Sequence, residues 1–293
     1  MDNINGIVIV NKDKGFTSHD VVNVIRRIFS TRKVGHTGTL DPDATGVLPI
    51  CIGKATKIAD MLTSSDKCYV ARVRLGLITD TQDISGKVLS TSKVNVTLDE
   101  LNEAVAKFKG EIQQIPPMYS AVKVNGKKLC DLARKGIEVE RKPRKIVIYS
   151  AEVSDFNFCE FTLSVHCSKG TYIRTLCHDI GAYLGCGAVM CELQRTKSSI
   201  FTLDSSHTLD ELKEMDDLAL RSCLMPIDEV FMDYPIFCIN DSLKKKLCNG
   251  APCFVNLDEG TYRVYDNDGI FLCIAKAEGD HAKKQLKLVK TFY

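Results

Sequence analysis

Apolar residues recur along the chain at two spacings, one typical of strands and one typical of helices. Alternating or continuous apolar runs predict strands at residues 6–10, 47–52, 69–75, 146–153, 161–167 and 189–201. Apolar residues three and four positions apart predict helices at residues 18–29, 97–109, 172–184 and 208–215. Ser18 and Thr97 are the expected N-caps of the first two helices, because their hydroxyls can accept backbone N–H groups. These elements come in mixed order, so we predict an α+β fold with a mixed, mainly antiparallel central sheet and flanking helices.

The pattern changes after about Tyr234. From there, short apolar runs are separated by turn sequences such as Asn249-Gly250, which predicts a small β-rich module. A chain of 293 residues is long enough for one large and one small domain. We therefore expect a main domain over residues 1–234 and a module over residues 235–293.

Residues 35–46 are poorly explained by folding alone. They hold three glycines, three threonines, two aspartates, one proline and one histidine, and only Leu40 and Ala44 suit a core. The glycines leave the backbone free and Pro42 lacks an N–H donor, so the segment is expected to be a loop. One interpretation is a turn that caps neighbouring helices. The other is a functional loop held by a rigid scaffold.

Asp41 is the candidate reactive group of this loop. Pro42 biases it away from α geometry, and the flanking glycines permit close approach of a ligand. A carboxylate positioned in this way suits covalent or electrostatic work on a sugar or base. Asp43 lies two residues further on, which leaves a two-carboxylate arrangement like that of a glycosidase open.

Charge is unevenly distributed along a nearly neutral chain. The net charge is +2, yet residues 123–145 hold nine basic and three acidic residues. A second basic group lies near the C-terminus, at Lys276, Lys283, Lys284, Lys287 and Lys290. Such runs are often solvated faces, but two separated basic regions favour docking of an extended polyanion such as nucleic acid.

Other features indicate a cytoplasmic protein without a metal. No apolar run approaches the roughly 20 residues that span a bilayer, and the N-terminus has no signal-peptide pattern. The thirteen cysteines are scattered without a Cys-x-x-Cys pair. They are expected to be reduced structural thiols rather than zinc ligands.

Residues 35–46 resemble the active-site motif of the bacterial tRNA pseudouridine synthase B (TruB) family. The resemblance runs from about Gly6 to Arg195 through five motifs in the expected order, and the C-terminal module resembles, loosely, an RNA-binding domain of the PUA type. It implies the pseudouridine synthase fold and isomerisation of uridine-55 in the T-loop of tRNA. It also implies that no cofactor and no metal are needed, and that the protein is a monomer with no obligatory protein partner. An insertion at about residues 114–145 resembles the family's clamp for the T-arm.

The resemblance assigns three catalytic residues. Asp41 is implied to be the nucleophile and Arg174 the arginine that pairs with it and keeps it ionised. Tyr69 is implied to line the pocket, to stack on the flipped-out base and to take part in proton transfer. Without the resemblance, Arg174 would be expected to point to solvent and Tyr69 to belong to the core. Asp43 is expected to be a turn or cap residue.

Four further residues are implied to contact the substrate. Tyr172 matches a second pocket tyrosine, Leu193 an apolar wall, His36 a residue at the RNA and Lys12 a substrate-contacting lysine. The chain also departs from the family at three positions. Asp13 stands where proline is usual, which is expected to loosen the turn at Lys12. Cys130 and Gln194 replace a common tyrosine and a common arginine, which is expected to lower RNA affinity.

Three other functions stay open. A non-catalytic RNA-binding or tRNA-folding protein would have the basic regions but no need for Asp41, Tyr69 and Arg174 together. A glycosidase using Asp41 and Asp43 would release free uracil. A synthase for a different RNA would keep the same site and differ in the insertion.

Overall fold

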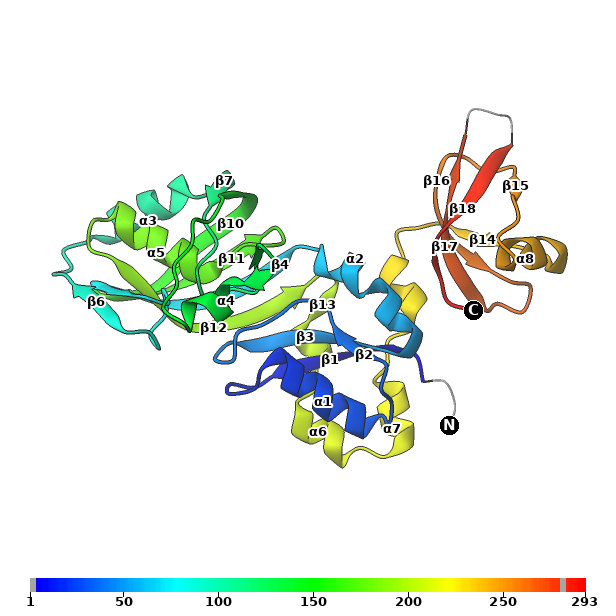
Figure 1. The fold of residues 1–293 in the computed structure, drawn as a ribbon, viewed down its shortest axis with the longest axis horizontal. Coiled ribbons are helices and arrows are strands. Elements are labelled where there is room, and N and C mark those ends of the chain that lie inside the picture. Colours follow the sequence, from blue (N-terminus) through cyan, green and yellow to red (C-terminus); the bar gives the residue numbers. More distant parts are fainter. Residues whose placement is uncertain (1–3, 280–282) are drawn as a thin grey trace.

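The computed structural model describes residues 4–279 and 283–293. Within them, a nine-stranded sheet forms the body of the molecule (Figure 1). Its main path runs β1 (Gly6–Lys12), β3 (Thr45–Ile52), β12 (Ala188–Ser198), β4 (Lys67–Leu75), β11 (Glu160–Cys167), β10 (Arg144–Asn157) and β7 (Gly110–Gln114). Two short strands, β2 (Val34–His36) and β13 (Phe201–Thr202), pair with β3 and β12. The β3–β12 pair is parallel and the other neighbours in this sheet are antiparallel, which confirms the predicted mixed, mainly antiparallel sheet.

Four of the predicted helices share one hydrophobic core on one face of this sheet, which Leu220 also joins. They are α1 (Ser18–Ile28), α3 (Leu98–Lys107), α5 (Ile173–Tyr183) and α6 (Leu209–Glu214). Residues of β1 and β3 alternate between this core and a second apolar cluster on the opposite face. The sheet therefore buries both faces at the β1–β3 end.

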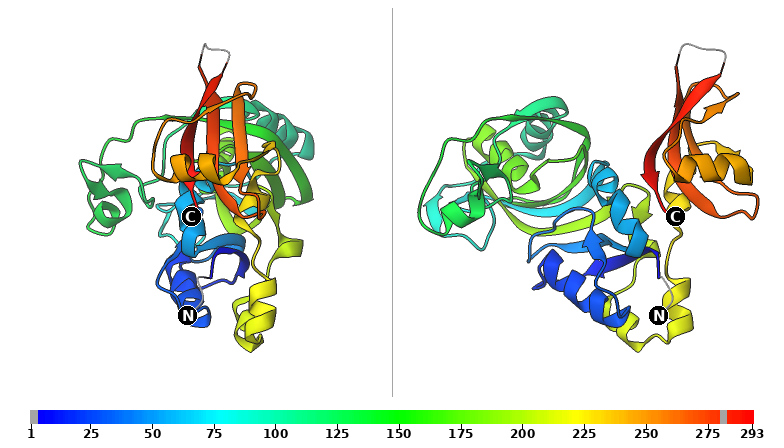
Figure 2. Two further views of the ribbon diagram at one scale, coloured as in Figure 1. Left: turned by 90° about the vertical axis from the view of Figure 1, so that its right-hand side faces the viewer. Right: turned by 45° about the vertical axis from the view of Figure 1, so that its right-hand side comes forward.

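The remaining elements lie in the connections. They are η1 (Gly53–Ile58), α2 (Ala59–Thr63), the hairpin of β5 (Leu77–Thr79) and β6 (Val88–Thr91), η2 (Leu203–Ser205), α7 (Asp217–Ser222) and η3 (Ile227–Phe231). The expected insertion holds a small hairpin of β8 (Lys123–Val124) and β9 (Lys127–Lys128), followed by α4 (Leu129–Ala133). In the left view of Figure 2 this green segment projects from the body. Among the described residues, no helix is long and apolar enough to cross a bilayer.

Some sequence predictions need correction. Thr17, not Ser18, is the N-cap of α1, because its side chain accepts from Asp20 N in a capping box. The strand predicted at residues 189–201 is two strands, since Ser199 adopts a positive φ of 57° and the chain reverses there. The loop predicted at residues 35–46 is shorter, because its first two residues belong to β2 and its last two to β3.

A second sheet of five strands is built by the C-terminal part of the chain. Its strands are β14 (Ile236–Cys238), β15 (Phe254–Val255), β16 (Gly260–Tyr265), β17 (Phe271–Glu278) and β18 (Lys284–Thr291), with α8 (Asp241–Cys248) beside them. It has its own apolar cluster. Figures 1 and 2 show it set apart from the large sheet, beyond α2.

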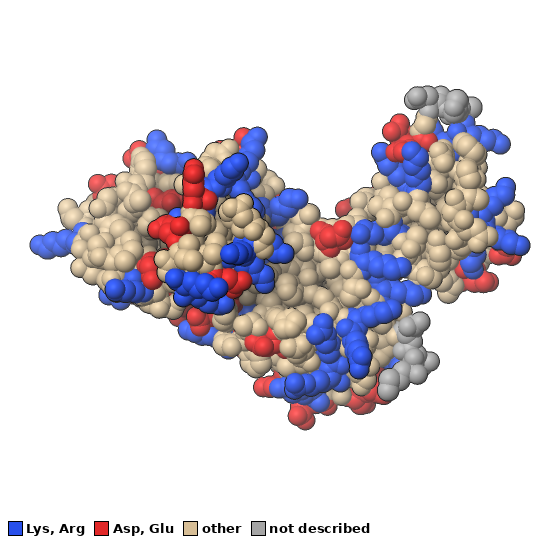
Figure 3. All heavy atoms as spheres, in the orientation of Figure 1, with Lys and Arg blue, Asp and Glu red and all other residues tan. Residues whose placement is uncertain are grey.

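Three kinds of contact attach this C-terminal sheet to the body. Ile274 and Phe292 join the apolar cluster on the outer face of β1 and β3. The Lys57 ammonium donates to Thr291 O at 2.8 Å. Lys290 pairs with Asp60 of α2 at 3.1 Å. Figure 3 shows a band of Lys and Arg atoms that runs across this junction.

Candidate active site

The loop that carries Asp41 joins β2 to β3 and is fixed on both sides of the aspartate. On one side, the Ser18 hydroxyl donates to Leu40 O (3.1 Å) and accepts from Leu40 N (2.8 Å). On the other side, the Lys12 ammonium donates to Pro42 O at 3.0 Å. The first residue of α1 and the last residue of β1 therefore set the backbone on either side of the carboxylate.

Lys12 is fully buried, and three backbone carbonyls accept from its ammonium. Besides Pro42 O these are Asp13 O (2.9 Å) and Phe16 O (2.8 Å). Burial lowers the pKa of Lys12 to about 8, against the opposing effect of nearby carboxylates, Asp13 foremost. In this structure the ammonium holds the loop, and the substrate contact of Lys12 stays a prediction.

Arg174 joins the Asp41 loop to two other segments of the chain. Its Nε lies 3.0 Å from Asp41 Oδ2 and its Nη1 lies 3.3 Å from Asp83 Oδ2. Nη1 also donates to Thr81 O (3.2 Å) and Nη2 to Tyr119 O (2.8 Å). The Arg174 side chain is only 7% exposed. It therefore orients the carboxylate from a buried position instead of pointing to solvent.

Asp83 is a site residue that the sequence analysis missed. Its carboxylate accepts from Thr81 Oγ1 (2.7 Å), Ser85 N (3.0 Å) and Ser85 Oγ (2.6 Å). Gln82, between Thr81 and Asp83, has a positive φ of 65°, a conformation that few non-glycine residues adopt. The available signal was the spacing Thr81-x-Asp83-x-Ser85, which is typical of a turn closed by an aspartate side chain.

Opposing effects act on the pKa of Asp41. Burial raises the pKa of its carboxyl, and the Arg174 guanidinium lowers it, without reversing the net upward direction. Asp83 raises this pKa further, while Lys12 lowers it. The Asp41 side chain nevertheless keeps 43% of its surface exposed, so it remains accessible to a substrate. Asp43, by contrast, is exposed in a turn.

Tyr69 lies on β4 beside the same site. Its cross-strand neighbours are Val165 on β11 and Arg195 on β12. Arg195 and Leu193 are both buried, and they share a face of β12 because they are two residues apart. His36, at the end of β2, is partly buried, and its Nδ1 accepts from the backbone N–H of residue 38 at 3.3 Å. Burial lowers the pKa of His36, and Arg195 adds to this effect.

Tyr172 is the N-cap of α5, two residues before Arg174. Its backbone N–H donates to Gln114 Oε1 (2.8 Å) and its carbonyl accepts from Gln114 Nε2 (3.1 Å). Gln114 is buried at the end of β7. The residue that opens the insertion thus fixes the start of α5, a role that no sequence pattern around Gln114 indicates.

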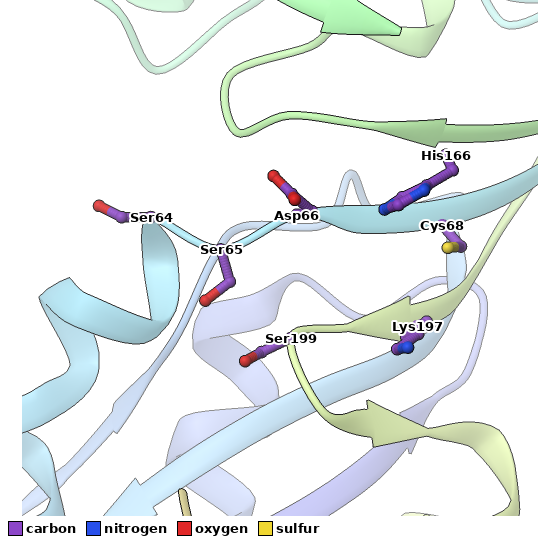
Figure 4. Close-up of a pocket in the computed structure, with 7 residues that line it drawn as sticks. All are labelled: Ser64, Ser65, Asp66, Cys68, His166, Lys197 and Ser199. Carbon is purple, nitrogen blue, oxygen red and sulfur yellow. The ribbon is translucent and has the colours of Figure 1, made fainter. Parts of the chain in front are cut away.

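A polar hollow of about 370 Å³ lies near these residues but does not belong to their cluster (Figure 4). Its lining residues are Ser64, Ser65, Asp66, Cys68, His166, Lys197 and Ser199. Cys68 directly precedes Tyr69 on β4 and pairs with His166 and Lys197 across the neighbouring strands. Successive strand residues point to opposite faces, so the hollow opens on the other face of the sheet from Tyr69.

Comparison with known proteins identifies the family. A model described as "TruB family pseudouridylate synthase (N terminal domain)" matches residues 26–173. A second, described as "tRNA pseudouridylate synthase B C-terminal domain", matches residues 174–232. The chain belongs to the TruB family. It is accordingly a pseudouridine synthase, an isomerase.

Individual members of the TruB family are similar in sequence to this chain along nearly its whole length. The tRNA pseudouridine synthase B of Clostridium kluyveri is 44% identical over 295 residues, covering 99% of this chain and 100% of the relative. That of Clostridium novyi is 45% identical over 293 residues, covering 98% and 99%. A chain in the crystal structure of a Cbf5–Nop10–Gar1 complex superposes with a TM-score of 0.76 at 27% identity, covering 99% of this chain and 85% of that chain. These likenesses confirm the expected pseudouridine synthase fold.

Proposed function

We propose that this TruB-family enzyme isomerises uridine-55 in the T-loop of tRNA, with Asp41 as the nucleophile on a flipped-out uridine. The observation that carries the proposal is the 3.0 Å contact between Arg174 and Asp41, in a loop held on both sides of the aspartate. A rigidly placed, accessible carboxylate suits covalent chemistry. The names of the curated relatives support tRNA as the substrate.

The proposed reaction rearranges bonds without a redox change. The N1–C1′ bond breaks, the uracil rotates in the pocket and C5 joins C1′. C5 then loses a proton and N1 gains one, so no net water is consumed. We propose that no cofactor takes part, because each step needs only a nucleophile, a proton acceptor and a pocket that holds the free base.

The remaining assigned residues would form that pocket. Tyr69 offers an aromatic face for stacking on the flipped base and a hydroxyl for proton transfer. Tyr172 and Leu193 would supply further walls, since each lies two residues before a buried arginine of the site. His36 would contact the RNA from the end of β2.

Two parts of the chain would hold the RNA outside the pocket. We propose residues 1–234 as the catalytic domain and residues 235–293 as a PUA-like RNA-binding module. The insertion at about residues 114–145 projects from the catalytic domain (Figure 2) and exposes Lys123, Lys127 and Lys128. Such cations suit a phosphate backbone. We propose that the enzyme works as a monomer without an obligatory protein partner.

Pseudouridine mapping in a T-arm hairpin after incubation with the purified protein tests this function. We expect one pseudouridine, at the position of uridine-55, and no release of uracil. Modification of a different uridine, or of none, would refute the proposed substrate. Free uracil as the product would instead indicate a glycosidase.

A further inference from the structure

Arg195 is a buried arginine at the centre of the site to which no role has been assigned above. It is 1% exposed. Its Nε donates to Val47 O at 2.7 Å and its Nη2 to Gly38 O at 3.2 Å. It thereby touches both ends of the segment that carries Asp41. On β12 it lies directly across from Tyr69 of β4.

The charge of Arg195 is not matched by a carboxylate. Across residues 4–279 and 283–293, no Asp or Glu forms an ion pair with it, whereas Arg174 pairs with both Asp41 and Asp83. Burying a cation without a counter-ion is costly. Such a buried cation is most useful beside an active site if an anion forms there during the reaction, because the cation then stabilises that anion.

The Tyr69 hydroxyl is the group placed to become that anion. Arg195 lies directly across from Tyr69 on the neighbouring strand, and its guanidinium lowers the pKa of the Tyr69 hydroxyl. Three charged or titratable groups act on the pKa of Tyr69: Arg195 of β12, Cys167 of β11 and Asp41 of its loop. Burial raises the pKa of Tyr69, and of these three groups only Arg195 lowers it. Burial also raises the pKa of Cys167 to about 12, which leaves that thiol neutral.

We propose that Arg195 is a positioning residue that orients Tyr69 and stabilises its phenolate, the form that accepts the proton lost from C5. This inference rests on the proposed function. In the step concerned, the C5–H bond of the rejoined uracil breaks, its electron pair forms the C5=C6 double bond, and the C6=N1 pair moves to N1. The Tyr69 phenolate takes the C5 proton and N1 takes a proton from water. The hydroxide left by that water then removes the proton from Tyr69, which restores the phenolate. The buried guanidinium stays charged throughout.

Ultraviolet titration of the tyrosine phenolate tests this role without substrate. The chain has nine tyrosines and no tryptophan, so the difference between the intact protein and its Tyr69→Phe variant isolates Tyr69. The same difference is then measured in an Arg195→Gln background. We expect the Tyr69 midpoint to rise by about one pH unit, a tenfold change in its ionisation constant, and Arg195→Lys to give a smaller rise. An unchanged midpoint overturns the proposal.

Lys67→Met is the matched control. Lys67 is also buried and lies two residues before Tyr69 on β4, but its ammonium donates to Thr63 O and Ser65 O. We expect its removal to leave the Tyr69 midpoint in place. An equal rise in this variant would show a general effect of lost buried charge and would overturn the specific role of Arg195. If Arg195→Gln does not fold, the Tyr69 midpoint is measured in Arg195→Lys instead. A midpoint that does not rise in Arg195→Lys likewise overturns the proposal.

The pH profile of kcat on a T-arm hairpin links the charge to turnover. We expect Arg195→Gln to shift the limb that depends on the phenolate to higher pH with little change in KM. A purely structural arginine would lower kcat equally at all pH values, and that result overturns the proposal. Full activity of Tyr69→Phe would refute the proton transfer given under the proposed function. The titration would still report separately whether Arg195 stabilises the phenolate.

Discussion

Asp41 and Asp43 lie two residues apart on one loop, yet their surroundings differ. Asp41 contacts a buried arginine at 3.0 Å, whereas Asp43 is exposed in the turn. The residue types alone left a pair of catalytic carboxylates open. The geometry favours a single one, because no arginine or lysine is found in an ion pair with Asp43 within the described chain.

Substitution of each aspartate tests this difference. We expect Asp41→Asn to lower pseudouridine formation by roughly 10⁴-fold or more, as loss of a nucleophile does, while binding of the tRNA persists. Asp43→Asn is the matched control and should keep most of the activity. Rates on a T-arm hairpin and a filter-binding assay measure the two effects. Reversed behaviour of the two variants would move the nucleophile to Asp43.

A second prediction concerns the pH dependence of stability. Because burial raises the pKa of Asp41, the folded state favours the protonated carboxyl, and its contribution to stability is present at low pH and lost as pH rises. We therefore expect Asp41→Asn to gain in free energy of unfolding, relative to the unaltered protein, as the pH rises above about 4, the ordinary pKa of an aspartate. Urea unfolding at several pH values measures this.

Asp20→Asn is the control for that experiment. Hydrogen bonds from Thr17 lower the pKa of Asp20, so its contribution is lost as pH falls instead. The Asp20 contribution changes below about pH 4 and the Asp41 contribution above it, so pH should alter the relative stabilities of the two variants in opposite directions and in separate ranges. A common direction would contradict the assigned environment of Asp41.

At the scale of elements, the sequence predicts most of the body and less of the connections. The strands and the four core helices are found because each buries a regular apolar face. By contrast, α7 and β13 are short and have no such face. In the sequence, Arg195 is an ordinary basic residue of a predicted strand. Only its spacing of two from Leu193, which is buried, indicates that both lie on one face. Gln114 acts on Tyr172, 58 residues away, a contact that only the assembled sheet creates.

The β3–β12 contact gives a prediction at this scale. A Cβ added to Gly46 would lie 2.2 Å from Arg195 O, and the φ of Gly46 is +100°. We expect Gly46→Ala to lower the free energy of unfolding by about 2–5 kcal/mol from overlap and backbone strain. Gly15→Ala is the control, with φ of +89° and no atom within 4 Å of the added Cβ, and should cost about 1–2 kcal/mol. If urea unfolding shows the same loss of free energy for Gly46→Ala and Gly15→Ala, then β3 and β12 do not approach each other closely at Gly46.

For the whole molecule, the C-terminal sheet and the body are joined through a shared core. Phe292 is 5% exposed and packs in the cluster of Ile7 and Phe201, so the two parts should unfold together. We expect Phe292→Ala to lower the free energy of unfolding by about 3–5 kcal/mol. Phe158→Ala, at a side chain 82% exposed, should change it by less than about 0.5 kcal/mol. A separate early transition in calorimetry would instead show that the module unfolds by itself.

The place of β12 in the sheet affects how the molecule assembles during synthesis. β3 and β4 follow each other closely in the chain, yet β12 lies between them. Until residues 188–198 have been made, each of these strands presents an unpaired edge, and edges of that kind invite pairing with other chains. At 5–20 residues per second, the ribosome needs roughly 8–30 s to pass from Asp41 to Arg195. A nascent chain therefore holds its aspartate loop without Arg195 for that time and without Arg174 for most of it, and throughout it presents two open edges that other chains can pair with.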